Sequence, residues 1–302
     1  MIKCYEVIVV DDCSPYGEKV IVDTYLEKYS NLKYIRHDIN KRQGGARNTG
    51  IRAAIGEYVM FLDSDDCIKY QNTFAILLEY LKKSNPVILR SNSYSPFSND
   101  KSYLQIKDKY LGDVSSKSFD FVQWRLSEFF GCSAWATLYR REFLVENNLY
   151  FRENVLYEDT DWTQKVLYYA GNINLIDFSY YAYRENPNSI TRKPSIGAFE
   201  GNVEGVIETY KFYKEKIDWN DSFGKELKNR FIKTIFSLLK NSRHYPISVT
   251  MKFMKRLNKC GLTSLKGMDF KSNIVLGLVH FLPILPLFAV KVIAIKRRVL
   301  VM

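Results

Sequence analysis

Three aspartates close an apolar run in the first quarter of the chain. Residues 58–62 read Tyr-Val-Met-Phe-Leu, and Asp63, Ser64, Asp65 and Asp66 follow them. An apolar run bounded by polar residues predicts a strand buried on both faces of a parallel sheet. No Lys or Arg stands among the aspartates, so their charges repel one another unless a cation joins them. Mg²⁺ or Mn²⁺ takes such oxygen ligands and is commonly completed by substrate phosphates. A solvated polar turn is the alternative interpretation.

A second strand ends in the same way. Residues 6–10 are mostly apolar and β-branched, and Asp11 and Asp12 follow directly. In open α/β sheets, ligands bind at the carboxyl ends of the strands. Two acidic strand ends therefore favour a cleft for a nucleotide and a metal over two unrelated turns.

The surrounding sequence alternates strand and helix patterns, which predicts an α/β sheet with parallel strands. The expected strands are residues 7–10, 32–36, 58–62, 87–90 and 173–176. The expected helices are residues 17–29, 43–54, 71–83, 118–130, 141–147 and 159–170.

The positive charge of the chain is concentrated in its last quarter. The net charge is +11, yet residues 1–220 hold 28 Lys and Arg against 30 Asp and Glu, and residues 221–302 hold 16 against 3. The slightly acidic body argues against nucleic-acid binding, which needs a basic groove. A basic amphipathic helix from Phe223 and the uncharged segment 272–290 predict membrane association, either spanning the bilayer or lying on it. A buried C-terminal helix pair is the alternative.

Cysteine and histidine usage gives no sign of a zinc site or a disulfide framework. The chain has five cysteines without CxxC spacing and three histidines, which fits a reducing compartment. No long apolar leader precedes the first expected strand. Together with the basic tail, these features predict a place at the cytoplasmic face of the cell membrane.

With these landmarks placed, the sequence resembles the family 2 glycosyltransferases, which have the GT-A fold. The resemblance covers residues 5 to about 192 and rests on five motifs in order. They are Glu6–Ser14 (EVIVVDDCS), Asn40–Gly50 (NKRQGGARNTG), Gly56–Asp66 (GEYVMFLDSDD), the pair Ala134–Arg141 and Tyr157–Trp162, and the closing Tyr183–Ile190.

The resemblance implies a Rossmann-like, mostly parallel sheet flanked by helices in residues 1–215, and a helical, membrane-associating extension in residues 216–302. It implies that the enzyme transfers a sugar, in the manner of a hexosyltransferase, from a nucleotide-linked donor, with UDP expected, to a hydroxyl of a glycan or polyprenyl-linked acceptor. The expected setting is bacterial surface polysaccharide synthesis. The reaction would invert the anomeric carbon and depend on Mn²⁺ or Mg²⁺.

On the donor side, the resemblance assigns Asp63 and Asp65 to the metal, with Asp65 the direct ligand. Asp66 would hold the metal's water or the donor sugar. Asp11 and Asp12 would contact the base and the ribose, where carboxylates accept hydrogen bonds. Arg47 would pair with the diphosphate; a surface arginine near Asp38 is its alternative interpretation.

On the acceptor side, the resemblance makes Asp159 the general base, within an acidic motif that includes Glu158, and Asp161 the alternative base. Acidic residues at a helix start also stabilise the helix dipole, whatever the function. Trp135 is expected to stack on an acceptor sugar, although a core tryptophan is the alternative.

The sequence departs from the family pattern in more than one place, and the first of these departures bears on activity. The strand and helix that normally precede the Val7 strand are absent, so that strand is expected to become partly an edge. Cys13 stands where Gly or Asn is usual. A catalytically impaired relic is therefore one alternative. A nucleotidyltransferase is another, although the glycine-rich basic loop that it needs is not visible.

Overall fold

The computed structural model describes residues 5–92, 94–97, 112, 114–120, 133–185 and 195–265. The chain divides into two compact units, Met1–Asn188 and Ser189–Met302. This boundary lies before the helix at 196–214, whereas the sequence suggested a boundary after residue 215.

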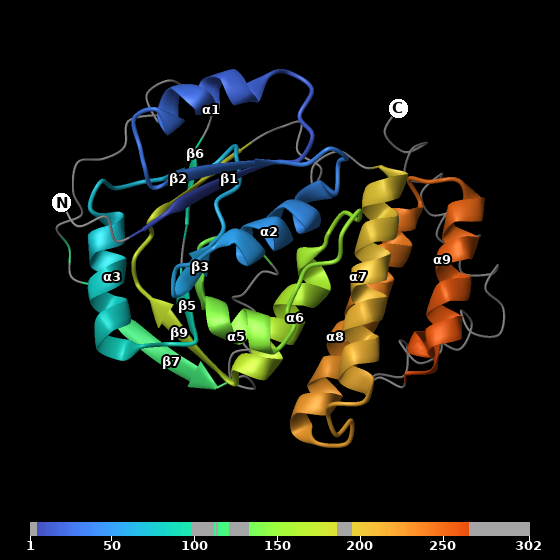
Figure 1. The fold of residues 1–302 in the computed structure, drawn as a ribbon. Helices are drawn as coiled ribbons and strands as arrows, with labels where there is room; N and C mark the ends of the chain where they lie inside the picture. Colours follow the sequence, from blue (N-terminus) through green and yellow to red (C-terminus); the bar gives the residue numbers. More distant parts are fainter. Residues whose placement is uncertain are drawn as a thin grey trace, which may run out of the picture. The chain divides into compact units, whose positions relative to one another are not determined.

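The first unit alternates strands and helices along most of its length (Figure 1). Its strands are β1 (Val7–Asp11), β2 (Leu32–Arg36), β3 (Tyr58–Met60), β4 (Cys67–Ile68), β5 (Ile88–Ser91), β6 (Ser95–Phe97), β7 (Ser116–Asp120), β8 (Thr137–Arg140), β9 (Asn172–Ile176) and β10 (Tyr181–Arg184). Its helices are α1 (Glu18–Leu26), α2 (Arg42–Ala53), α3 (Thr73–Ser84), α5 (Arg141–Glu146) and α6 (Asp159–Ala170).

The main sheet is mixed, which corrects the expectation of a mostly parallel one. Its strand order is β3-β8-β5-β9-β7, and among these described strands only the β5–β9 pair is parallel. The difference arises because β8, which the strand–helix alternation did not predict, lies antiparallel between β3 and β5. Strand β3 therefore pairs with an antiparallel neighbour, not within the parallel sheet that its apolar run suggested.

Strand β7 replaces the start of the helix expected at residues 118–130. It pairs antiparallel with β9 over Ser116–Asp120. Phe119 packs against the core between exposed neighbours, which is the period-two pattern of a half-buried strand. Residues 121–132 lie outside the described part of the chain.

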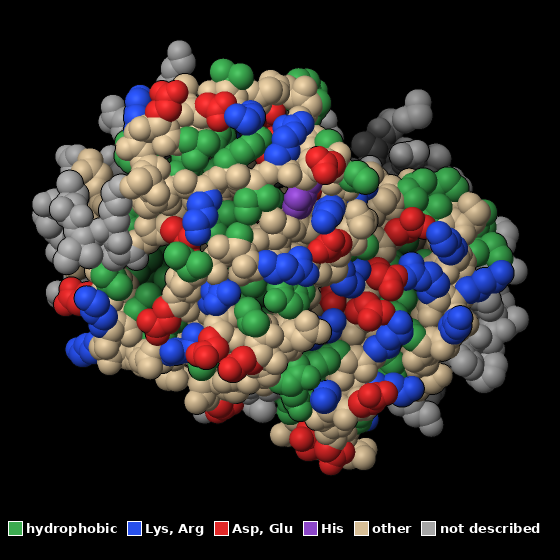
Figure 2. All heavy atoms as spheres, viewed as in Figure 1, with side chains coloured by type: hydrophobic (Ala, Val, Ile, Leu, Met, Phe, Trp, Pro, Cys, Tyr) green, Lys and Arg blue, Asp and Glu red, His purple; other side chains and the backbone are tan. Residues whose placement is uncertain are grey.

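The N-terminal strands β1 and β2 form a separate sheet of two strands, and neither has another partner among the described strands. They pair in parallel from Val7↔Leu32 to Asp11↔Arg36. Helices α1 and α2 contact this pair, α1 through β2 and α2 through β1 (Figure 1). Helix α1 buries none of its residues, and Val20 and Ile21 are exposed. Figure 2 shows hydrophobic side chains at the surface beside this helix.

Aromatic side chains fill the core beneath α6. Trp162 is buried and stacks on Phe151 with ring centroids 4.0 Å apart. Its indole Nε1 donates a hydrogen bond to the Leu149 carbonyl at 2.9 Å, which satisfies the polar atom that burial would otherwise leave unpaired. This packing fixes the start of α6, where the Glu158–Asp161 motif lies.

In its described part, the second unit is a bundle of the helices α7 (Ile196–Lys214), α8 (Ser222–Ser242) and α9 (Ile247–Cys260), followed by a 3₁₀ turn at Leu262–Ser264 (Figure 1). The stripe predicted from Phe223 is confirmed as a helix face: Phe223, Leu227, Phe231, Ile235 and Leu238 are all buried. An amphipathic helix whose apolar stripe is buried is the usual core element of a bundle.

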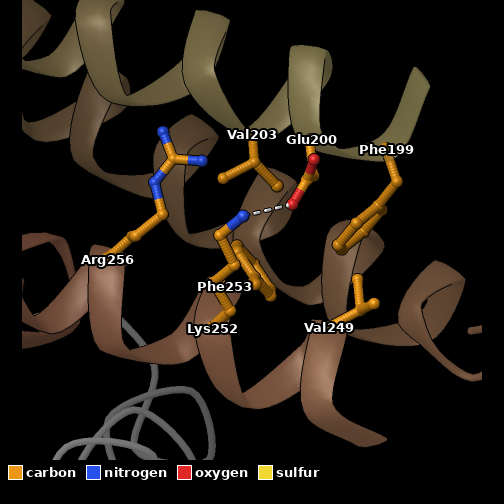
Figure 3. Close-up of a pocket in the computed structure, with 7 residues that line it drawn as sticks. All are labelled: Phe199, Glu200, Val203, Val249, Lys252, Phe253 and Arg256. Atoms are coloured by element: carbon orange, nitrogen blue, oxygen red, sulfur yellow. Dashed lines mark hydrogen bonds and ion pairs between the residues drawn. The ribbon is translucent and has the colours of Figure 1, made fainter. Parts of the chain in front are cut away.

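Helices α7 and α9 pack closely, as Figure 3 shows. Phe199 and Val203 of α7 meet Val249 and Phe253 of α9 around a gap of ≈ 10 Å³, and Lys252 pairs with Glu200 at 2.7 Å beside it. A space this small holds about one water, so this gap is a packing feature and no ligand site.

No helix in the described ranges combines the length and the apolar character needed to cross a bilayer. The uncharged segment 272–290, on which the sequence prediction of membrane insertion depends, lies outside those ranges. The described part of the second unit is a helical extension, and membrane association stays a prediction.

Candidate active site

The acidic residues after β3 form a closed turn. The Asp66 amide donates to the Asp63 carbonyl at 3.0 Å. The Asp66 carboxylate accepts from the Tyr181 hydroxyl at 2.6 Å and from the Arg184 amide at 2.8 Å. Asp65 is exposed and makes no hydrogen bond or ion pair with another described residue. The turn thus presents one carboxylate to solvent while its neighbours are tied to the protein.

Arg47 joins this turn to the motif at the start of α6. Its guanidinium bonds the Asp63 carboxylate at 2.8 Å and also pairs with the Glu158 carboxylate. The Arg47 side chain is only 10% exposed, so the surface-arginine interpretation is wrong. Two carboxylates already bind the guanidinium, so Arg47 holds acidic groups in position here. Its contact with a diphosphate stays a prediction.

A glycine allows α2 to bring Arg47 to that place. A Cβ atom on Gly44 would lie 2.1 Å from the Arg152 carbonyl oxygen and 3.3 Å from the Glu158 Cβ. Any larger residue would push α2 away from the segment that leads into α6. Asn48, one turn beyond Gly44, then bonds the Phe151 backbone through both its amide nitrogen and its oxygen, at 2.9 and 2.8 Å.

Asp159 is the acidic group with the most perturbed titration in this region. Burial raises the pKa of its carboxyl, the Glu158 charge raises it further, and the Arg47 guanidinium opposes both, leaving it at about 7. A carboxylate with a pKa near the working pH is well suited to accept a proton. The predicted base thus has an environment that fits the role.

Asp161, the alternative base, is placed differently. Its carboxylate is 2% exposed and pairs with Arg152 at 2.7 Å and with Lys165 at 2.8 Å. A buried carboxylate whose two oxygens each pair with a cation is poorly placed to meet a substrate hydroxyl. The geometry therefore favours Asp159 over Asp161.

The two aspartates after β1 are also held within the protein. Asp11 accepts hydrogen bonds from Tyr34 at 2.6 Å and from the Ser14 amide at 2.7 Å, and it pairs with Arg36. Burial alone would raise the pKa of the Asp11 carboxyl, but these partners lower it to about 2. The negative charge of Asp11 is therefore already compensated.

Asp12 is tied to the segment that leads into α2. Its Oδ1 atom lies 2.7 Å from His37 Nδ1 and 2.8 Å from the Lys41 amide. His37 is buried and contacts the Thr49 hydroxyl through its other ring nitrogen at 2.8 Å. Asp12, His37 and Thr49 thus connect the end of β1, the segment after β2 and α2 in one hydrogen-bond network.

Trp135 lies in an aromatic cluster next to the acidic turn. Its ring stacks on Tyr181 at 4.8 Å and on Tyr183 at 5.6 Å, with planes within 22° of parallel. Tyr94 meets it edge-on at 5.0 Å. Because these rings occupy its surroundings, Trp135 resembles a packed tryptophan more than an open platform for an acceptor sugar.

The donor groups of the acidic turn fit a hard divalent cation that substrate oxygens complete. Within the described ranges, no group of three or more His, Cys, Asp and Glu side chains is arranged to hold a metal by itself. The charged side chains of the turn are nevertheless all carboxylates, and the Asp65 carboxylate has no partner among the described residues. Burial raises the pKa of the Asp66 carboxyl, and the charges of Asp65 and Asp63 add to this rise. A cation at the turn would relieve that repulsion.

Sequence reasoning missed the residues that hold the aspartates in place. Tyr34, Arg36 and His37 on and after β2 and Tyr181 on β10 all bond to predicted site carboxylates. No motif in the sequence assigned Tyr181 a role. A signal was available for Arg36 and His37, because parallel pairing of β1 with β2 aligns Asp11 with Arg36.

Comparison with known proteins gives a consistent result for the first unit. Residues 2–146 match the model of the family described as "Glycosyl transferase family 2". The uncharacterized glycosyltransferase EpsJ of Bacillus subtilis is 28% identical over 222 residues, which are 72% of this chain and 62% of that protein. The cholesterol galactosyltransferase of Borreliella burgdorferi is 27% identical over 65% of this chain and 56% of its own length. The chain thus spans about three fifths of the length of these relatives.

Solved structures share the fold. The structure of Staphylococcus aureus TarS 1-349 in complex with UDP-GlcNAc aligns with a TM-score of 0.67, covering 95% of this chain and 82% of that one at 22% identity. The same TarS fragment is also known with UDP, with the same TM-score of 0.67. At this identity the likeness establishes the GT-A-like α/β fold.

Proposed function

We propose that this chain, whose residues 2–146 match the model of glycosyl transferase family 2, transfers a sugar from a UDP-linked donor to a hydroxyl group. The observation that carries this proposal is that one buried guanidinium links two acidic segments that lie far apart in the sequence. Arg47 holds Asp63 of the acidic turn and Glu158 of the α6 motif. A donor site and a general base are thereby fixed to one another.

In the proposed reaction, the acceptor oxygen attacks the anomeric carbon of the donor sugar. Its proton passes to the Asp159 carboxylate, and the bond from the anomeric carbon to the diphosphate oxygen breaks, so that UDP leaves. A single base and an in-line attack imply inversion at the anomeric carbon. Asp159 suits this role because its pKa of about 7 lies near the working pH.

Asp65 and Asp63 would hold Mn²⁺ or Mg²⁺ together with the donor diphosphate, and the cation would neutralise the charge that develops on the leaving group. Asp65 is the group most free to do this, because Asp63 shares its charge with Arg47. Asp66 would act through its neighbours, since both of its oxygens accept hydrogen bonds from β10.

For the nucleoside, we propose Asp12 as the direct contact and Asp11 as its support. Both partners of Asp12 bond to Oδ1, whereas Asp11 is bonded through both oxygens. The complexes of TarS with UDP and UDP-GlcNAc support a UDP-linked donor by analogy of fold.

The acceptor and the cellular setting form the next part of the proposal. We propose a glycan or polyprenyl-linked acceptor in surface polysaccharide synthesis; support comes from a poly(ribitol-phosphate) beta-glucosyltransferase of Bacillus spizizenii, which is 45% identical over 65 residues. For membrane contact, the support is the basic outer face of α9, where Lys252, Lys255 and Lys259 are exposed. Figure 2 shows Lys and Arg side chains gathered over this helix. Such a face attracts an anionic leaflet, which would place the enzyme at the cytoplasmic face of the membrane.

The proposal is tested by incubating the purified chain with a panel of UDP-sugars, Mn²⁺ and a polyprenyl-diphosphate-linked glycan. UDP release that requires the acceptor, together with a product heavier by one sugar, is the expected result. The Asp159→Asn variant should lose this activity while it keeps UDP binding. Acceptor-dependent release of UDP at the wild-type rate from that variant would refute Asp159 as the base.

A further inference from the structure

One hydroxyl group connects both ends of the acidic turn. The Tyr181 Oη atom donates to Asp66 Oδ2 at 2.6 Å and accepts from the Asp63 amide at 3.3 Å. Tyr181 is fully buried. A buried hydroxyl that both donates and accepts is fixed in orientation, and its bond to a carboxylate is charge-assisted.

The backbone around Tyr181 holds the same turn from a second direction. Strand β10 pairs antiparallel with β4, through Tyr181↔Ile68 and Ala182↔Cys67. Strand β4 begins at the residue directly after the turn. The Arg184 amide, three residues along β10, donates to Asp66 Oδ1 at 2.8 Å. The turn is thus bonded to β10 at its first and last residues.

The ring of Tyr181 is in turn supported by Trp135. The two rings stack with centroids 4.8 Å apart and planes 18° from parallel. Trp135 lies just before β8, the strand that pairs with β3 along Met60↔Leu138. Since β3 leads into the acidic turn, the stack fixes the tyrosine relative to the strand that the turn follows.

We propose that Tyr181 is a positioning residue for the metal and diphosphate site, and that Trp135 supports its ring. The hydroxyl holds the turn in the shape that exposes Asp65 and aligns it with Asp63. Trp135 then acts on the donor side of the reaction, through Tyr181, and not as a platform for the acceptor sugar. This inference rests on the proposed function.

The test compares two neighbouring tyrosines. Tyr181→Phe keeps the stacked ring and removes the hydroxyl. Tyr180→Phe is the matched control, because Tyr180 is equally buried and its hydroxyl has no hydrogen-bond partner in the described part of the chain. UDP binding is measured by calorimetry with Mn²⁺ and without it, and thermal unfolding is measured in parallel.

Tyr181→Phe should weaken the Mn²⁺-dependent UDP affinity about tenfold, a size typical of residues that orient metal ligands. Its metal-free UDP affinity should stay at the wild-type level. In turnover, KM for the donor should rise while KM for the acceptor stays the same. Tyr180→Phe should match the wild type in all of these measurements.

Two outcomes for Tyr181→Phe would overturn the inference. One is an unchanged Mn²⁺-dependent affinity. The other is an equal loss of UDP affinity with and without Mn²⁺, which would reveal a general structural role. If Tyr181→Phe does not fold, Trp135→Phe takes its place and should show the same selective loss at two- to threefold. A wild-type chain whose UDP binding ignores Mn²⁺ would instead refute the proposed metal site itself.

Discussion

The strands β1 and β3 both lead into aspartates, and the two acidic clusters differ in how far other groups of the protein compensate their charge. After β1, Asp11 and Asp12 are matched by groups of the protein itself: Arg36 and Tyr34 for the first, His37 and the Lys41 amide for the second. After β3, the turn holds three carboxylates, and Arg47, shared with Glu158, is the cation paired with it. Asp65 has no such partner in the described residues.

This contrast separates a compensated acidic cluster from one that still lacks positive charge. At the first cluster the pKa of Asp11 falls to about 2. At the second, burial raises the pKa of Asp66, and its acidic neighbours raise it further. Charge left uncompensated in a folded protein marks a place where a ligand supplies the missing partner. The acidic motif alone does not distinguish the two cases, whereas the partners of each carboxylate do.

The largest expected effect tests this difference directly. Asp65→Asn should lower transfer about a thousandfold and abolish the stimulation of UDP binding by Mn²⁺, because a metal contributes several kcal/mol to the transition state. The exposed side chain should leave the melting temperature unchanged. Asp12→Asn is the matched variant at the other cluster and should weaken UDP binding equally with and without Mn²⁺. Full Mn²⁺-dependent transfer by Asp65→Asn would contradict the view that the cluster after β3, unlike the one after β1, lacks a positive partner that a metal supplies.

The next effect concerns Asp159 and has opposite signs for activity and stability. Asp159→Asn should lower turnover by about 10²- to 10⁴-fold, as loss of a general base does. Because the folded-state pKa of about 7 lies above the ordinary 3.8, the carboxyl's contribution to stability is complete below about pH 4 and lost as the pH rises through 7. The variant should therefore melt at a higher temperature than the wild type at pH 8, with the gain vanishing near pH 4. A lower melting temperature at pH 8 would contradict the assigned environment.

Asp161, two residues further on, should respond in the opposite way. Asp161→Asn leaves Arg152 and Lys165 without their buried partner, which should cost about 3 kcal/mol of unfolding free energy. Donor KM should change little once the measurement is made well below the melting temperature. Denaturant unfolding supplies the free energy. An Asp161→Asn variant with wild-type stability and greatly reduced turnover would make Asp161 the base.

At the compensated cluster, Asp11→Asn should act on stability. Losing charge-assisted bonds to Arg36 and Tyr34 should cost about 2 kcal/mol. The folded pKa of about 2 lies below the ordinary 3.8, so the wild-type advantage is present above pH 4 and lost as the pH falls toward 2. Chemical denaturation at pH 7 and at pH 3 checks both the size and its decline. An advantage that grows on acidification would contradict the assignment.

The sequence predicted several helices and strands well, because they depend on local pattern. The helix at Asp159–Ala170 and the strand at Leu32–Arg36 were predicted with their observed bounds. The mixed sheet could not be predicted, since the placement of β8 between β3 and β5 is a long-range pairing that leaves no mark in β8 itself. The partners of Asp161 and Asp66 were missed for the same reason: Arg152 and Tyr181 reach them only through the fold.

The smallest expected effect is that of replacing Cys13, which follows Asp11 and Asp12 at the end of β1. Cys13 has a φ of 63°, in the left-handed region that favours glycine. Cys13→Gly should remove a backbone cost of about 1 kcal/mol, partly offset by the greater freedom of glycine in the unfolded chain. A net gain of about 0.5 kcal/mol in unfolding free energy is expected, with UDP affinity unchanged. Cys13→Ala keeps the β-carbon and is the control that should show no such gain. Equal gains from both variants would mean that the thiol, and not the backbone, is the source of the strain.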